Sequence, residues 1–89
     1  MFKPFELGKL VMTQGAAALI GQGNDPLPLI ARHKGGDWGD VCPSDAELND
    51  AATNDGDRVH SAYTLGGEKI WIITESDRSV TTLLLPDEY

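Results

Sequence analysis

The chain has very little cysteine and no long apolar segment. Its single cysteine, Cys42, excludes an internal disulfide and fits a reducing cytoplasm. No apolar run approaches the roughly 20 residues that a membrane-spanning helix needs. The first ten residues, MFKPFELGKL, lack the apolar core of a signal peptide. We therefore expect a cytoplasmic protein that does not contact membranes.

Basic residues are also scarce. Lys and Arg total 7 against 14 Asp and Glu, so the formal net charge is -7. A surface of this sign repels nucleic acid and anionic lipid at long range, and it suits docking to a basic protein. We therefore expect a protein partner and no direct binding of nucleic acid. A chain of 89 residues predicts one small domain spanning residues 1–89.

Metal-ligand spacing is missing as well. Cys42 has no second cysteine and no evident histidine partner, and the remaining candidate ligands do not recur at the intervals of a metal site. No glycine-rich loop leads from a strand into a helix, as a dinucleotide site would require. The sequence therefore predicts neither a metal nor a cofactor.

The first half of the sequence predicts one strand and three short helices. Their ranges are Phe5–Thr13 for the strand, and Gln14–Gly21, Pro26–Lys34 and Ser44–Asn54 for the helices, with Asn24 or Asp25 as the cap of the second helix. Gly8 predicts a bulge or bend within the strand. Thr13 is a suitable N-terminal cap for the first helix, and Pro26 suits the first position of the second. Ser44 and Glu47 match a capping box at the third.

Each of the two later helices carries a predicted apolar stripe and a terminating glycine. The stripes consist of Leu27, Ile30 and Ala31 in the second helix and Leu48, Ala51 and Ala52 in the third. Gly35 or Gly36 ends the second helix in a left-handed conformation, and Gly56 closes the third. Both helices are thus expected to lay one face on the core.

The last third is rich in β-branched and aromatic residues. It predicts three strands, over residues 58–64, 68–74 and 79–85. Gly66-Gly67 marks a tight hairpin, and Ser76 to Arg78 make the second reversal. Apolar residues on both faces of the middle strand indicate a central position. The expected fold is α+β: this three-stranded meander plus the N-terminal strand form a four-stranded, mainly antiparallel sheet, with the three short helices between.

The last strand, SVTTLLL, is a candidate edge of this sheet. An uncovered apolar edge invites pairing with another chain. The sequence therefore predicts a homodimer as one way of covering it.

The stretch HKGGDWGD, residues 33–40, has two explanations. As structure, His33 to Gly36 end a helix, and Trp38 anchors the crossover to the next helix. As chemistry, His33 with Asp37 or Asp40 forms an acid–base loop. The glycines do not make a phosphate loop, because they follow a helix rather than precede one. Asp37 and Asp40 are either turn-forming carboxylates or a partner contact, and both alternatives stay open here.

A second set of candidates lies near the end of the chain. His33, Arg78 and Thr82 are the residue types that a small metal-independent ribonuclease or toxin uses to move protons and stabilise a pentavalent phosphate. The structural alternative is turn chemistry around Arg78 and ordinary strand threonines. An acidic chain favours the structural alternative, because enzymes that act on RNA normally carry a basic surface.

Aromatic and charged side chains also suggest a surface for a protein partner. Tyr63, Trp71 and Trp38 form either an exposed patch or part of the core. The tail PDEY is acidic and able to extend beyond the sheet. The predicted partner-binding residues are Asp37, Trp38, Asp40, Asp77, Arg78 and Tyr89.

The sequence resembles a family of short bacterial proteins found largely on plasmids and integrative elements. The matching segments are FELGKLVMT, RHKGGDWGD, SDAELND, RVHSAYT and KIWIITESDRSVTTLLLPDEY, which cover nearly the whole chain. Two positions differ: Thr13-Gln14-Gly15 stands where the family more often has Thr-Pro-Gly, and His60 where it usually has leucine. Labels given to the family include "plasmid-related protein" and "type I restriction endonuclease subunit M". The latter does not suit 89 residues without a cofactor domain.

These observations lead to two functional hypotheses. The first is a non-enzymatic, acidic accessory protein of plasmids or integrative elements that acts by protein–protein contact. It would modulate or inhibit a host defence or nucleic-acid-handling complex. The alternative is the ribonuclease or toxin using His33, Arg78 and Thr82. Convergence of these three side chains in a cleft would favour the enzyme, and their separation would favour the binding protein.

Overall fold

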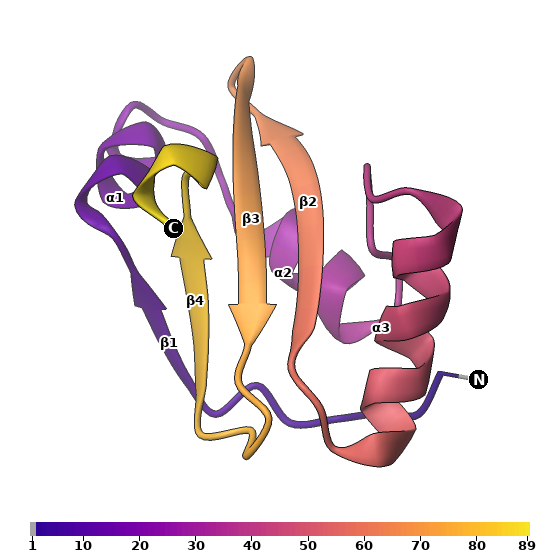
Figure 1. Cartoon of the computed structure of the whole chain (residues 1–89). Coiled ribbons are helices and arrows are strands. Elements are labelled where there is room, and N and C mark those ends of the chain that lie inside the picture. Colours follow the sequence, from indigo (N-terminus) through magenta and orange to yellow (C-terminus); the bar gives the residue numbers. More distant parts are fainter. Residues whose placement is uncertain (1) are drawn as a thin grey trace.

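Four strands form one sheet in the order β1–β4–β3–β2 in the computed structural model, which describes residues 2–89. The elements in chain order are β1 (Lys9–Met12), α1 (Gln14–Gly21), α2 (Leu27–Lys34), α3 (Pro43–Asp55), β2 (Val59–Leu65), β3 (Glu68–Thr74), β4 (Val80–Leu84) and a 3-10 turn, η1 (Pro86–Glu88). In Figure 1, α1 and α2 lie behind the sheet, α3 flanks β2, and η1 lies in front of β4. We call the two sides of the sheet the helix face and the open face.

The predicted α+β class and the C-terminal meander are confirmed. β2 pairs antiparallel with β3, and β3 with β4. β1 pairs with β4 in parallel, from Lys9 beside Val80 to Met12 beside Leu83, so the sheet is mixed. β4 is therefore an interior strand, and its prediction as an edge is wrong. The N-terminal strand covers it, which local sequence patterns cannot reveal.

Gly8 is what lets the chain enter β1 beside the β3–β4 turn. Its φ is +65°, and a Cβ placed there would lie 2.4 Å from the carbonyl oxygens of Arg78 and Ser79. Any side chain would therefore clash with backbone, in addition to the strain of a left-handed conformation. The predicted bend at Gly8 is confirmed, and it shortens the strand to Lys9–Met12.

The outer edge of β2 is covered by its own chain. The Ala62 amide donates to the Trp38 carbonyl at 3.1 Å, and the Asp40 amide donates to the Ala62 carbonyl at 2.7 Å. The Asn49 side chain donates to the His60 carbonyl at 2.7 Å and accepts from the His60 amide at 3.1 Å. A loop and a helix thus satisfy backbone groups that an edge strand would otherwise present to water.

Helix boundaries agree with the sequence for α1 and differ for the other two helices. Thr13 caps α1 through its side chain, and Gly56, at φ +77°, ends α3. Both were predicted. The predicted capping box at Ser44 is wrong: α3 begins at Pro43, after Cys42. The Ser44 hydroxyl lies 3.3 Å from the Cys42 sulfur instead.

The predicted apolar stripes of α2 and α3 are confirmed at Ile30, which packs against the core, and at Ala52, which is buried, but they are wrong at the two leucines. Leu27 is 65% exposed and Leu48 67% exposed. α2 buries Leu29 and His33, and α3 buries Asn49, Ala52 and Thr53. The reason is that α3 packs on a strand edge, where small and hydrogen-bonding side chains fit better than leucine. Among residues 2–89, no helix has the length and apolar character needed to cross a membrane.

The core lies between the helix face and α1 and α2, and it continues under the N-terminal segment. The larger cluster of buried residues comprises Ala16, Leu19, Leu29, Tyr63, Ile70, Ile72 and Leu83. The smaller cluster comprises Phe5, Trp38, Ala52 and Val59. Trp38 is 4% exposed, and its indole N–H donates to Asp50 at 2.9 Å. This confirms its prediction as an anchor between α2 and α3.

Candidate functional site

His33 is the centre of a buried chain of hydrogen bonds on the helix face. Its Nδ1 lies 2.5 Å from the Ser61 hydroxyl, and its Nε2 lies 2.8 Å from the Thr74 hydroxyl. Thr74 is 2.7 Å from the Thr81 hydroxyl, which donates to the Leu7 carbonyl at 2.7 Å. The chain thus ties α2, three strands and the N-terminal segment together.

The direction of these bonds determines the tautomer of His33. The Thr81 hydroxyl donates its proton to the Leu7 carbonyl, so its oxygen accepts the hydrogen bond from the Thr74 hydroxyl. Thr74 in turn accepts from the imidazole, which places the His33 proton on Nε2. Nδ1 is then left to accept from Ser61. With the ring neutral and its proton on Nε2, every member of this chain of hydrogen bonds has a partner, and the Ser61 hydroxyl also lies 3.4 Å from the Ile72 carbonyl.

Burial keeps His33 in that neutral form. The loss of hydration lowers its pKa to about 4, with smaller contributions from His60 and Arg78. His33, Ser61, Thr74 and Thr81 are all 0% exposed. No substrate reaches the imidazole or the Ser61 hydroxyl in this conformation, so the network supports the fold rather than a reaction.

The structure does not bring the proposed nuclease residues together. Arg78 lies in the β3–β4 turn, and its guanidinium donates to the carbonyls of Ala52, Glu75 and Asp57. Thr82 lies next to Ile73 on the open face, on the other side of the sheet from His33. The three side chains therefore do not share a cleft, and Arg78 is occupied in joining the turn to the end of α3.

The two unexplained aspartates of HKGGDWGD hold the loop in place. The Arg32 guanidinium donates to both oxygens of Asp37, at 2.8 and 3.2 Å. This pairing, helped by the Gly39 amide, holds the pKa of Asp37 below its ordinary value. Asp40 pairs with Lys69 at 3.2 Å. These contacts support the turn-forming alternative, although both carboxylates remain at the surface.

The other predicted partner-binding residues are divided between loop, core and surface. Asp77 accepts from the backbone and hydroxyl of Ser79, which lowers its pKa. Trp38 lies in the core, so its ring does not present a surface to a partner. Tyr63 is buried too, and its hydroxyl donates to the Asp37 carbonyl at 2.7 Å. Tyr89 is exposed, on the open face.

Aromatic side chains line up across the open face. The His60 and Trp71 rings are 4.4 Å apart between centroids, and the Trp71 and Tyr89 rings are 5.7 Å apart. The Arg58 guanidinium donates to the Tyr89 hydroxyl at 2.7 Å. We call His60, Trp71 and Tyr89 the aromatic row. It joins three segments of the chain, β2, β3 and the residue after η1.

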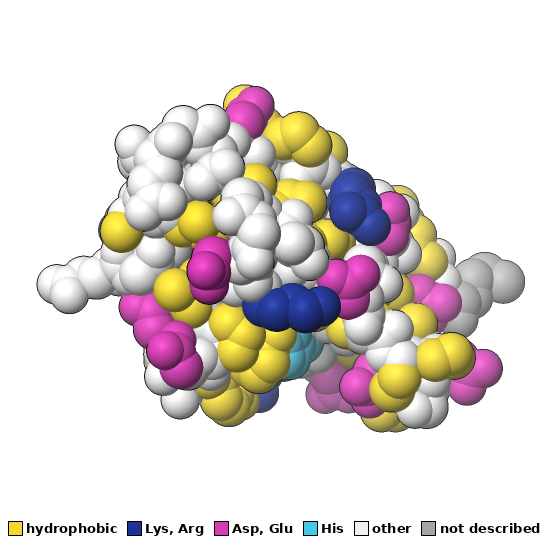
Figure 2. All heavy atoms as spheres, turned by 90° about the horizontal axis from the view of Figure 1, so that it is seen from above, with side chains coloured by type: hydrophobic (Ala, Val, Ile, Leu, Met, Phe, Trp, Pro, Cys, Tyr) yellow, Lys and Arg dark blue, Asp and Glu magenta, His cyan; other side chains and the backbone are white. Residues whose placement is uncertain are grey.

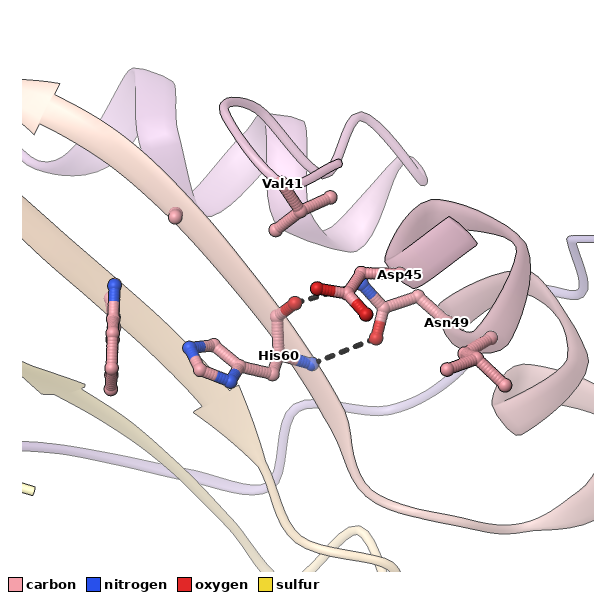
Figure 3. Close-up of a pocket in the computed structure, with 7 residues that line it drawn as sticks. Val41, Asp45, Asn49 and His60 are labelled. Carbon is pink, nitrogen blue, oxygen red and sulfur yellow. Dashed lines mark hydrogen bonds between the residues drawn. The ribbon is translucent and has the colours of Figure 1, made fainter. Parts of the chain in front are cut away.

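A hollow of about 300 Å³ lies between this row and α3. Its apolar lining comes from Val41, Leu48, Ala62 and Trp71, and its polar lining from Asp45, Asn49 and His60. Asp45 and Asn49 project from α3 toward β2, where His60 lies (Figure 3). Figure 2 shows histidine atoms beside a recess, with apolar side chains next to them and acidic groups across it.

The electrostatics of the hollow are set by one carboxylate. Asp45 is the only formally charged residue in the lining, and no Lys or Arg contributes to it. Burial is the main cause of a lowered pKa at His60, and the nearby Arg58 adds to it. Asp45 acts in the opposite direction and favours the protonated imidazole. The site thus attracts positive charge.

The sequence did not predict this hollow. His60 was singled out only as a departure from the family pattern, and Asp45 and Asn49 were not considered as site residues. The hollow depends on how α3 lies against the edge of β2, which Asn49 holds by its two hydrogen bonds to His60. An asparagine in the middle of a helix gives no sequence signal for such a contact.

Residues 2–89 contain no group of three or more potential metal ligands close together. Cys42 is exposed, without a disulfide partner.

Comparison with known protein families, curated proteins and solved structures found no match to this chain.

Proposed function

We propose that this protein is a binding module that takes a basic segment of a partner protein on its open face. The hollow beside the aromatic row would receive a lysine or arginine side chain of that segment. The observation that carries the proposal is the lining of the hollow: one carboxylate, one tryptophan and no cationic residue.

The lining suits each part of a long cationic side chain. Asp45 offers a carboxylate for the charged head, and Trp71 offers an aromatic ring to which cations are attracted. Val41 and Leu48 offer apolar surface for the aliphatic stem. The net charge of -7 would guide a basic partner toward the protein before contact.

The separation of His33, Arg78 and Thr82 supports a binding protein over an enzyme. A nuclease needs a base, an acid and a charge stabiliser around one phosphate. Here the histidine is buried, and the arginine is bonded to backbone carbonyls. An acidic surface also opposes the approach of RNA.

We extend the proposal to the biological setting that the sequence resemblance suggests. The protein would act in the cytoplasm as an accessory of plasmids or integrative elements. Its partner would be a host defence or nucleic-acid-handling complex, modulated or inhibited by contact. Such complexes carry basic surfaces where they meet nucleic acid, and an acidic module is complementary to them.

The proposal is tested with two short synthetic peptides of equal length, one rich in arginine and lysine and one rich in glutamate. Nuclear magnetic resonance titration should show shifts at His60 and Trp71 for the basic peptide only. Asp45→Asn should weaken that binding about three- to tenfold, since one charge–charge contact is lost.

Asp55→Asn is the matched control, because it removes the same charge from the same helix outside the hollow. It should leave the affinity nearly unchanged. Equal weakening by both variants would show that the peptide responds to overall charge and not to the hollow. Absence of shifts at His60 and Trp71 would contradict the proposal directly.

A further inference from the structure

The two edges of the sheet differ in whether other parts of the chain cover them. The edge at β2 is covered by the Trp38–Asp40 segment and by Asn49. The edge at β1 pairs only with β4, on its inner side, among residues 2–89. In Figure 1, β1 is the outermost strand on that side of the sheet, with α1 above its end.

The outer side of β1 presents both backbone groups and apolar side chains. The Lys9 and Thr13 amides donate to β4 and its preceding turn, at Ser79 and Leu83. Because successive residues of a strand point their backbone groups in opposite directions, those of Leu10 and Met12 point away from the sheet. Their side chains are 45% and 47% exposed.

We propose that β1 pairs with β1 of a second copy of this chain, antiparallel and centred on Val11. The outward amide and carbonyl of Leu10 would form hydrogen bonds with the carbonyl and amide of the second copy's Met12. The amide and carbonyl of Met12 would pair in the same way with the second copy's Leu10. On the helix face, the exposed Leu10 side chain would lie beside the second copy's Met12. A two-fold axis repeats this pair, so the apolar patch of Leu10 and Met12 on each copy is covered by the same patch on the other copy.

Charge complementarity favours a second copy as the occupant. In this register Lys9 lies opposite the second copy's Thr13, on the open face. The Thr13 hydroxyl donates to the Glu88 carboxylate, which also accepts from the Gly15 amide at 2.8 Å. The Lys9 ammonium of each copy therefore approaches the Glu88 carboxylate of the other. Leu10, Val11 and Met12 themselves bring no charge to the interface.

This inference does not depend on the proposed function, although a dimer would place two open faces side by side on one continuous sheet. It is tested by sedimentation equilibrium of the full chain from roughly 1 µM to 1 mM, a span that separates weak dimers from monomers. Wild-type protein should pass from monomer to dimer across this range. Amide exchange at Leu10 and Met12 should slow as the concentration rises.

Met12→Lys should raise the dissociation constant at least tenfold, since lysine on an edge opposes strand addition. Leu27→Lys is the matched control: it changes an exposed leucine on α2 in the same way and should leave dimerisation unchanged. Lys9→Glu should weaken the dimer about two- to fivefold, because it turns two attractions into repulsions.

Two results would overturn the proposal. One is a wild-type protein that stays monomeric throughout the concentration range. The other is a dimer that Met12→Lys does not weaken while circular dichroism shows the variant to be folded. In the second case the copies would meet through a different surface.

Discussion

His33 and His60 lie on opposite sides of the same sheet, and their surroundings differ in almost every respect. His33 is sealed in the core, and both ring nitrogens have hydroxyl partners. The His60 ring stacks edge-on against Trp71 and faces a hollow. The pKa of each is lowered mainly by burial, but only His60 has a carboxylate that acts against this.

The two faces of one sheet thus give the same residue type two different environments. A fully satisfied buried network restricts the packing of the elements it joins, and it has no capacity left for a ligand. A partly exposed histidine beside an acidic residue and a tryptophan retains that capacity. Residue type alone would have favoured His33 as the functional histidine, since it lies next to the conspicuous GDWG motif.

The largest expected effect is the loss of the His33 imidazole. His33→Leu should lower the free energy of unfolding by about 4 kcal/mol, because it removes the two buried hydrogen bonds that join α2 to Ser61 and Thr74 and places a side chain of different shape in a closed core. His60→Leu should change it by less than about 1 kcal/mol, as a substitution on a half-exposed face. Urea unfolding at pH 7 measures both. Similar losses for the two variants would remove the distinction between the faces.

The next effect is a dependence of stability on pH. In the unfolded chain histidine takes up a proton below its ordinary pKa of 6.5, whereas folded His33 does so only near 4. Between these values the unfolded state binds more protons, so stability is lost as the pH falls, by about 3 kcal/mol in total. Urea unfolding at several pH values should show this slope. His33→Leu should flatten it, and an unchanged slope in that variant would assign it to other groups.

A matched pair of threonines sharpens the comparison. Thr74→Val should cost about 2 kcal/mol, because the His33 Nε2–H then has no acceptor in the core. Thr82→Val should cost less than about 0.5 kcal/mol, since Thr82 lies half-buried on the open face and valine favours strands. Thermal unfolding of both variants provides the measurement. An equal loss of stability in the two variants would mean that Thr82 is packed as tightly on the open face as Thr74 is in the core.

The smallest effect concerns the charge on His60. Asp45→Asn should lower the pKa of His60 further, because the wild-type carboxylate favours the protonated ring. The pKa of His33 should not move. Proton resonances of the two imidazoles, followed through a pH titration, report both at once. A rise in the pKa of His60 would contradict the assigned role of Asp45.

Much of the fold was predictable because its signals are local. The Thr13 cap, the three C-terminal strands and the anchoring role of Trp38 follow from residue types within a few positions of each other. The apolar stripes failed at Leu27 and Leu48 for the opposite reason. A helix presents several faces of similar hydrophobicity, and which one is buried depends on the element that it meets.

The candidate site was less predictable than the fold. Tyr89 was identified from the sequence as a partner-binding residue and lies in the aromatic row. The hollow itself requires α3 to dock on the edge of β2, through Asn49 and the backbone of His60. Such contacts join positions that have no sequence pattern in common. The nuclease hypothesis shows the same limit, since it grouped residues that the sheet separates.

Local chemistry was sufficient to define the elements of this protein, its acidic character and the glycines at its turns, because these depend on neighbours along the chain. Long-range packing alone placed β1 beside β4 and put Thr74 and Thr82 on opposite sides of one sheet. It also buried one histidine and left the other beside a hollow. The physical reason is that burial, hydrogen-bond partners and nearby charges belong to a place in the folded molecule and not to a residue type.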